Sequence, residues 1–295
     1  MEKEVPKLRL QDEASTGCRV GVAVGGNNSL KRRRVQVKVT QEEISANLAQ
    51  ILEDPQMEGS DERSLSLQIL SRCLGNLTPE VQPKAMAQLW TWFPEVLMRQ
   101  PSALLWEAFE RLALQGAPSG TVENRSIFSI LAAARVFLMD EKRSGSDKES
   151  CLKALHSLVT YGHDSLTSLF TSEMLELLVS RCENLGVVGP TVRTVLGILG
   201  NLASRSEEFC KELSRSPKAE PFAKRLAKSL VWYKDQVAQE STLEVEVHLN
   251  YAMASLVMGW LAWGSSEAQQ HLEDQLGSTK VLLDLLRTFT VFQDR

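Results

Sequence analysis

The feature that most constrains this chain is a succession of amphipathic helical segments joined by short loops. From Thr40 onward, apolar residues recur at three- and four-residue spacing in one segment after another, which is the period of a helix that buries one face. Alternation with a period of two is confined to two short runs, Val35 to Val39 and Leu243 to Val247. We therefore expect an all-α protein with no sheet.

The pattern predicts roughly eleven to thirteen helices. They cover Thr40 to Leu52, Ser64 to Leu77, Val81 to Trp92, Ser102 to Leu114, Ser126 to Met139, Leu152 to Val159, Leu166 to Phe170, Met174 to Cys182, Thr191 to Ala203, Glu207 to Leu213, Pro221 to Gln239, Val245 to Trp263 and Ser278 to Phe292.

Several boundaries follow from individual residues. Thr40 and Glu43 form a capping box that begins the first helix. Pro94 is expected to end the helix that precedes it. The nearly all-apolar helix that ends at Met139 is expected to lie at the centre of the protein. We expect Lys142 to Lys148 to be a polar loop, and the polar stretch between Trp263 and Ser278 to be a turn.

A series of this kind folds as a bundle or as a helical-repeat solenoid. The solenoid is favoured by an internal echo, because the tetrapeptide LGNL occurs at Leu74–Leu77 and again at Leu199–Leu202. That spacing would hold three repeats of about 42 residues, which is within the armadillo and HEAT range. We predict an armadillo/HEAT-like right-handed solenoid over residues 40–295, preceded by a disordered tail over residues 1–39.

Composition narrows the class of function. The net charge of −4 gives no overall field for nucleic acid, so we expect no direct sequence-specific nucleic-acid contact. The five cysteines are widely spread and form no CxxC pair, which predicts a reducing compartment with cysteines acting as small hydrophobes. The uninterrupted apolar run Tyr251 to Trp263 is shorter than the about 20 residues that a membrane span needs, so we read it as a buried core helix.

No pattern in the chain predicts catalysis. The Gly-rich stretch Val20 to Asn28 lacks the Lys-Ser/Thr ending of a phosphate loop. His156 and His163 have no Cys or carboxylate at a zinc-like spacing, and no nucleophile elbow occurs. We expect a non-enzymatic protein with no catalytic residue, metal or cofactor. The alternative from the enzyme class is a helical hydrolase with an unrecognised site.

Two basic groups are candidate binding sites. Lys31, Arg32, Arg33 and Arg34 form a compact run that is typical of a nuclear-import signal or a phosphate-contacting arm, or of a solvated linker.

The second group, Lys224, Arg225, Lys228 and Trp232, lies on one predicted helix. Its basic residues share a face at three- and four-residue spacing. It is either a partner-binding surface or the solvated side of a helix whose Phe222, Leu226, Leu230 and Tyr233 face the core.

From Thr191 onward, the order of elements resembles the C-terminal domain of the Wapl (wings apart-like) family of cohesin regulators. The likeness lies in the apolar run Val195 to Leu202, in Tyr251 to Leu261, and in the closing segment Leu285 to Phe292. The resemblance implies a non-enzymatic nuclear protein that binds cohesin subunits and promotes release of cohesin from chromatin. Residues 1–190 show no match beyond their helical pattern.

A second resemblance is to importin-alpha-type armadillo proteins, which carry a basic arm and a helical array. Arg32 to Arg34 followed by the helix from Thr40 is similar to that arrangement, although the six tryptophans show no regular spacing from asparagines. This resemblance implies an adaptor or nuclear-transport protein. Both resemblances predict a protein-binding chain in the nucleus, with the cytoplasm as the alternative, and both leave the oligomeric state open.

Overall fold

The structure is a computed structural model that describes residues 83–99, 101–114, 124–162, 164–182, 190–239 and 243–285. Every regular element in these residues is a helix. The elements are α3 (Pro83–Arg99), α4 (Ala103–Ala113), α5 (Asn124–Met139), α6 (Gly145–Tyr161), the 3-10 helix η2 (Asp164–Leu169), α7 (Ser172–Arg181), α8 (Pro190–Arg205), α9 (Glu207–Arg215), α10 (Ala219–Ala238), α11 (Val245–Gly264) and α12 (Ser266–Leu276).

Residues 280–285 are also helical. The predicted tail over residues 1–39 and the predicted helices Thr40 to Leu52 and Ser64 to Leu77 lie outside the described residues.

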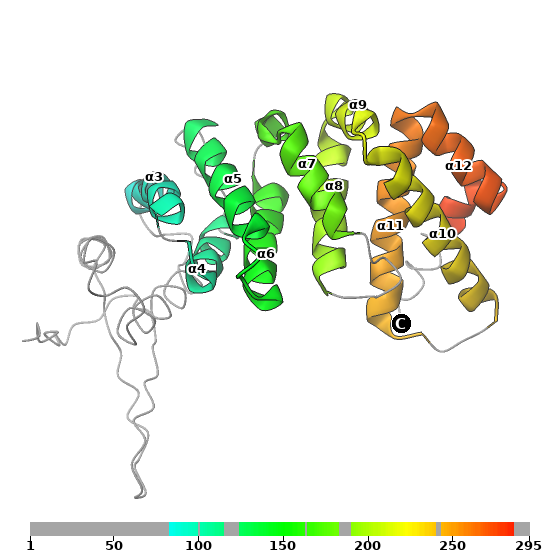
Figure 1. The fold of residues 1–295 in the computed structure, drawn as a ribbon, viewed down its shortest axis with the longest axis horizontal. Helices are drawn as coiled ribbons and strands as arrows, with labels where there is room; N and C mark the ends of the chain where they lie inside the picture. The colour runs from blue at the N-terminus through cyan, green and yellow to red at the C-terminus, as the bar shows by residue number, and fades with distance from the viewer. Residues whose placement is uncertain are drawn as a thin grey trace, which may run out of the picture.

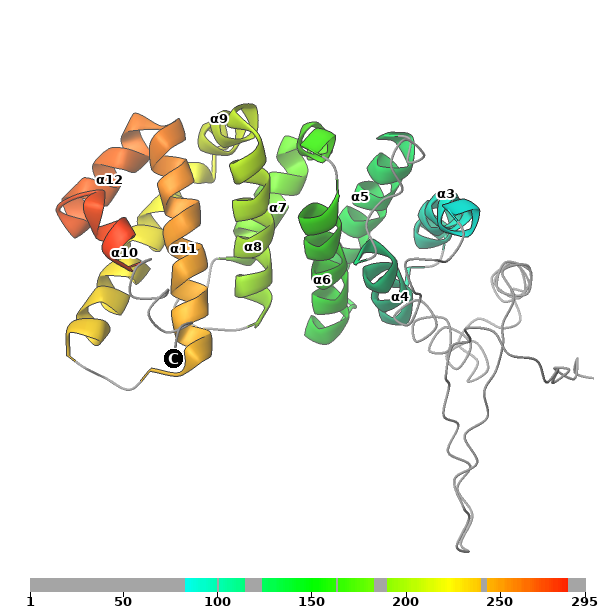
Figure 2. The ribbon, with the colours of Figure 1, turned by 180° about the vertical axis from the view of Figure 1, so that it is seen from behind.

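The described helices stack in two rows (Figure 1). α4, α6, α8 and α11 pack one against the next in that order, and Figure 2 shows α6, α8 and α11 standing side by side. We call these four helices the ladder row, and their outward side the ladder face. The second row runs through α3, α5, α7, α9, α10 and α12. This stacking of every second or third helix is that of a helical-repeat solenoid, as the sequence predicted.

Polar contacts between neighbouring helices of one row recur at a nearly constant sequence separation. Ser150 on α6 donates to Glu107 on α4, 43 residues earlier, and Arg181 on α7 donates to the Leu138 carbonyl of α5, also 43 residues earlier. Asn201 on α8 donates to Thr160 on α6 across 41 residues. A register of this length is the armadillo repeat period, so side-chain contacts show the periodicity for which the sequence offered only one tetrapeptide.

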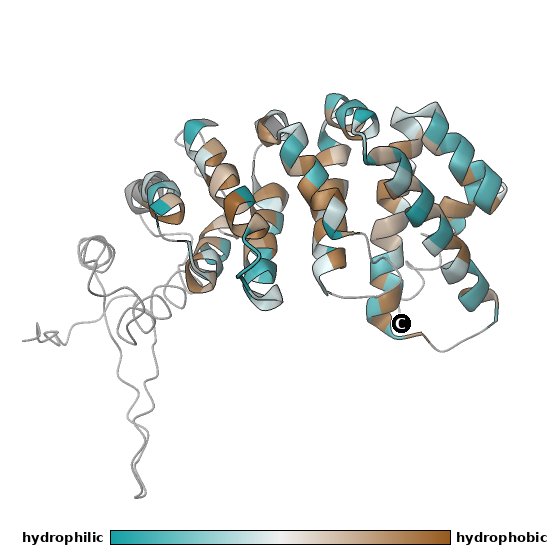
Figure 3. Cartoon of the chain, in the orientation of Figure 1, coloured by the Kyte–Doolittle hydropathy of each residue, from teal (hydrophilic) through white to brown (hydrophobic). Residues whose placement is uncertain are grey.

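The core lies between the two rows and is apolar (Figure 3). Trp106 and Phe109 of α4 are fully buried, and Trp106 lies edge-on to Phe109 with ring centroids 6.2 Å apart. The cysteines Cys151, Cys182 and Cys210 are buried and free. Burial raises the pKa of the Cys182 thiol to about 12, so these cysteines are small hydrophobes, as predicted.

Pro94 does not end its helix, which corrects the sequence prediction. α3 continues through Pro94 to Arg99. A proline inside a helix costs about 3 kcal/mol, but Val96 and Leu97 beyond it are 6% and 0% exposed. Burying such side chains contributes roughly 1.5–3 kcal/mol each, and this burial offsets the lost hydrogen bond.

Two polar segments that we expected to be loop or turn are helical. α6 begins at Gly145, inside the predicted loop, because Ser144 and Asp147 form a reciprocal capping box. α12 occupies the predicted turn, and the Ser265 side chain caps its first turn by accepting from the Ala268 amide. The buried side chains of α12 are Ala268, Leu272 and Leu276, a stripe of one residue per turn that is too narrow to stand out in the sequence.

The apolar helix α5 is less central than its composition predicted. Phe128, Val136 and Met139 are 52%, 63% and 59% exposed. Among the described residues, no helix is both long and apolar enough for a membrane span.

Close packing at Gly264 provides a test of the fold. An added Cβ at Gly264 would lie 2.7 Å from Ser214 Oγ and 3.0 Å from the Cys210 carbonyl oxygen of α9, whereas one at Gly200 would lie 3.7 Å from its nearest neighbour. We expect Gly264→Ala to lower the free energy of unfolding by about 1–3 kcal/mol through overpacking.

The matched variant Gly200→Ala should be neutral, or more stable by up to about 1 kcal/mol, because alanine favours the helix. Urea unfolding, monitored by circular dichroism, measures the free energy of unfolding of both variants. Equal stability of the two variants would contradict the packing of α11 on α9.

Candidate protein-binding face

The ladder face is built from exposed and half-buried positions of successive row helices. α6 contributes Glu149, Lys153, His156 and Thr160, and α8 contributes Arg193, Asn201 and Ser204. The α6 set follows the three- and four-residue spacing of one helical side, and the α8 set does so with Gly197 between Arg193 and Asn201. Because neighbouring row helices are held in register, these side chains form one continuous surface.

The α6 and α8 sections of the face are joined by side-chain hydrogen bonds. Asn201 Nδ2 donates to Thr160 Oγ1 over 3.0 Å, and Thr160 Oγ1 donates to the His156 carbonyl over 2.8 Å. At the end of α8, the Arg205 guanidinium donates to the carbonyls of Thr160 and Gly162, both at 2.8 Å. A cation at these terminal carbonyls stabilises the C-terminal end of α6 through the helix dipole.

Gly197 lets the histidine of α6 lie against α8. An added Cβ at Gly197 would be 2.6 Å from Nε2 of His156, so only glycine leaves room for the ring. Burial lowers the pKa of His156, and the nearby Arg193 guanidinium lowers it further. The neutral imidazole is therefore favoured in the folded protein.

Charged residues on the ladder face are largely paired. Lys153 lies 2.7 Å from Glu149, and Arg193 on α8 lies 3.5 Å from Glu246 on α11. These exposed pairs contribute little to stability. Their effect is to leave the α6 and α8 part of the face polar, with charges of both signs alternating across it.

The α11 section of the face is apolar. Leu249, Met253, Leu256, Trp260 and Trp263 follow one another at three- and four-residue spacing on its outward side. We call these five residues the α11 stripe. Leu256 is 40% and Trp263 57% exposed, and the rings of Trp260 and Trp263 meet edge to face with centroids 6.1 Å apart.

The sequence interpretation missed the α11 stripe because it assigned this helix wholly to the core. A signal was available, since the run Tyr251 to Trp263 is apolar on every side of the helix. Only one side packs on the core, through residues such as Val257, Met258 and Leu261. On the opposite side, Leu256 and Trp263 are exposed, whereas Met253 and Trp260 are half-buried and pack against the edge of the core.

The predicted basic group on α10 is divided by the structure. Lys224, Lys228 and Trp232 are exposed, while Arg225 is half-buried. Phe222, Leu226, Leu230 and Tyr233 are buried, as the alternative interpretation of this helix expected. Whether the exposed members bind a partner stays a prediction. The other predicted group, Lys31 to Arg34, lies outside the described residues.

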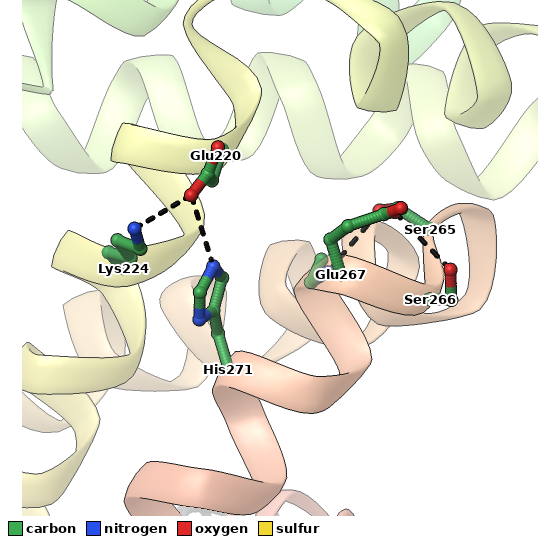
Figure 4. A network of polar contacts seen from close by, with 7 residues as sticks. Glu220, Lys224, Ser265, Ser266, Glu267 and His271 are labelled. Atoms are coloured by element: carbon green, nitrogen blue, oxygen red, sulfur yellow. Dashed lines mark hydrogen bonds and ion pairs between the residues drawn. The ribbon is translucent and has the colours of Figure 1, made fainter.

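Lys224 belongs to a polar network between α10 and α12 (Figure 4). Glu220 lies 2.7 Å from Lys224 Nζ and 3.5 Å from His271 Nε2 of α12. Lys224 holds the pKa of Glu220 below its usual range, and His271 adds to the effect. Nearby, Ser265 and Ser266 both donate to Glu267. Of these contacts, the one between Glu220 and His271 joins α10 to α12, whereas Lys224 pairs with Glu220 within α10.

Tyr233 and His248 form a buried polar contact between α10 and α11. Tyr233 Oη lies 2.6 Å from His248 Nδ1, and the Tyr233 ring stacks on Tyr251 at 4.6 Å. Burial raises the pKa of both tyrosines to about 12 and lowers the pKa of His248. The contact joins two neutral groups in the core. Within the described part of the chain, no group of three or more metal-ligating side chains comes together.

Comparisons with known proteins agree on the fold. No family model matches the chain, and no curated protein matches it in sequence. Among solved structures, a designed armadillo repeat protein is similar at TM-score 0.52 and 15% identity, covering 82% of this chain and 98% of its own. A second designed armadillo repeat protein, solved with the peptide (KR)4, has TM-score 0.50 and 14% identity over 81% of this chain and 98% of its own.

An engineered protein gives TM-score 0.54 at 15% identity, over 81% of this chain and 89% of its own. The fold is therefore an armadillo-like helical repeat.

The buried histidines predict how stability depends on pH. Free histidine has a pKa of about 6.5, and burial lowers the pKa of His248 and of His156 in the folded chain. At a pH between the pKa of free histidine and the lower pKa in the folded chain, the unfolded chain binds protons that the folded chain does not. Stability is therefore fully present above about pH 6.5 and falls as the pH drops below it, by at most about 1.4 kcal/mol per pH unit for each group.

Urea unfolding between pH 7.5 and 5.5 measures this slope. We expect His248→Gln, whose amide can still bond to Tyr233, to reduce the slope relative to the unmodified chain. An unchanged slope would mean that His248 is not held neutral by burial.

Proposed function

We propose that this chain is a protein-binding scaffold of the armadillo type and that the ladder face is its binding surface. The observation that carries this proposal is the continuity of the face. Four row helices present their side chains from Glu107 on α4 to Trp263 on α11, and hydrogen bonds such as Asn201 to Thr160 fix their register. A surface held rigid before binding loses less entropy when a partner docks.

The more specific proposal that the fold favours is an adaptor of the armadillo class, which binds an extended segment of another protein. It is supported by the armadillo class of the similar structures, one of which was solved with the peptide (KR)4. Asn201 offers an amide that can bond to a peptide backbone, and Trp260 and Trp263 offer faces that attract cationic side chains.

A second proposal is a Wapl-like regulator of cohesin release from chromatin. It is supported by the order of sequence elements between Thr191 and the last residues of the chain, and by no contact in the structure. The chain would act by preferring one conformation of the cohesin ring over another, without making or breaking a bond. Both proposals describe a non-enzymatic binding protein.

The two proposals and the binding face can be tested together. We expect the chain to bind a fluorescent (KR)4 peptide, and Trp260→Ala or Asn201→Ala to weaken binding about 5- to 100-fold, because central contacts of an interface contribute roughly 1–3 kcal/mol. Fluorescence polarisation measures the affinity. Phe128→Ala, an exposed aromatic on the second row, is the matched control and should bind like the unmodified chain.

Affinity purification provides the other arm of the test. Cohesin subunits among the captured proteins, lost with the same ladder-face variants, would favour the Wapl-like role. Peptide binding without cohesin would favour the adaptor. Capture that is indifferent to every ladder-face variant would contradict the face itself.

We further propose that the chain acts in the nucleus, with Lys31, Arg32, Arg33 and Arg34 as its import signal. Four adjacent cations are the chemistry that such signals share. Replacing all four with alanine should shift a fluorescent fusion from nucleus to cytoplasm in microscopy of living cells. Replacing Lys224 and Lys228 is the control, and a fusion that stays nuclear without residues 31–34 would contradict the assignment.

A further inference from the structure

The α11 stripe is an apolar section of the ladder face in which Leu256 and Trp263 are exposed and the other three residues are half-buried. Its members lie on one side of α11 between Leu249 and Trp263, which are about 21 Å apart along the helix. Contiguous exposed apolar patches are uncommon on proteins unless something covers them. We therefore expect another segment to cover the stripe, and the position of the last described residues indicates which one.

The described chain leaves the fold beside the stripe. Leu282 and Leu285 are buried, and an added Cβ at Gly259 of α11 would lie 3.8 Å from Leu282 Cδ1. Gly259 adjoins Leu256 and Trp263 on the helix surface, three residues after the first and four before the second. The residues that follow Leu285 therefore start next to the stripe.

The segment that follows has the composition and length to cover the stripe. Residues 286–295 lie outside the described part of the chain, and their sequence is LRTFTVFQDR. Four of the ten are large apolar residues, namely Leu286, Phe289, Val291 and Phe292. Ten residues reach at most about 33–36 Å, which exceeds the length of the stripe. Because the segment belongs to the same chain, its effective concentration at the stripe is high, which favours docking.

We propose that residues 286–295 dock on the α11 stripe of the same chain, with Phe289 and Phe292 against Leu256, Trp260 and Trp263. The segment covers the apolar end of the ladder face and leaves the polar α6 and α8 section open. A partner that contacts Trp260 or Trp263 must first displace this segment, whereas the docking itself takes place in the chain without a partner.

Site-specific photo-crosslinking in the full chain tests the proposal. Phe292 is replaced by the photoreactive residue p-benzoylphenylalanine, the dilute protein is irradiated, and crosslinked peptides are mapped by mass spectrometry. We expect crosslinks within one chain to residues between Leu249 and Trp263. Crosslinks between two chains, crosslinks to another part of the fold, or none at all would each overturn the proposal.

A pair of matched variants separates docking from mere proximity. Leu256→Asp places a charge in the stripe and should reduce the intrachain crosslink about fivefold or more, since burying an unpaired charge costs well over 1 kcal/mol. Leu283→Asp changes a leucine that is 58% exposed just before the segment and should leave the yield unchanged. Circular dichroism confirms that both variants are folded, and equal yields in the two would overturn the proposal.

Discussion

The guanidinium groups of Arg181 and Arg205 each reach back one repeat and bind the carbonyls at the end of an earlier helix. Arg181 at the end of α7 binds the Leu138 carbonyl of α5, and Arg205 at the end of α8 binds the Thr160 and Gly162 carbonyls of α6. Both reach across 43 residues, to Leu138 and to Gly162. Hydrophobic burial brings the helices together but does not choose their register, because apolar contacts are not directional. The charged hydrogen bonds supply that direction for α7 on α5 and for α8 on α6.

A fixed register is what turns separate helices into a surface. With α6 and α8 aligned, Asn201 meets Thr160 and Gly197 receives the ring of His156. The next step along the ladder row is longer, since α9 and the 20-residue α10 intervene before α11. There the face changes from polar to apolar. The proposed binding surface is thus polar where α6 and α8 form it and apolar where α11 forms it.

Much of this architecture could be predicted from the sequence. The helical class, the repeat organisation and most helices from α4 to α11 follow from apolar periodicity, and the buried cysteines follow from their spread. The prediction failed where a local signal competed with distant packing. Pro94 predicts the end of a helix, but α3 continues beyond it because Leu97 is buried there.

The ladder face was harder to predict, for a physical reason. Residues such as Thr160, Asn201 and Arg205 are ordinary polar residues in the sequence, and they acquire meaning only when helices about 43 residues apart lie side by side. The α11 stripe could not be predicted for another reason, because the sequence of an apolar helix does not indicate which side stays exposed. The group around Lys224 was visible in the sequence, yet the structure ties Lys224 to Glu220.

Crosslinking of engineered cysteine pairs tests the register of the ladder row most directly. In a background where Cys18 and Cys73 are serine, Thr160→Cys with Asn201→Cys places one thiol on each of α6 and α8, where the native side chains meet at 3.0 Å. A short bis-maleimide should join this pair efficiently and should fail with Glu107→Cys and Asn201→Cys, which lie on α4 and α8 with α6 between them. Efficient joining of the second pair, or none of the first, would contradict the stacked order on which the account rests.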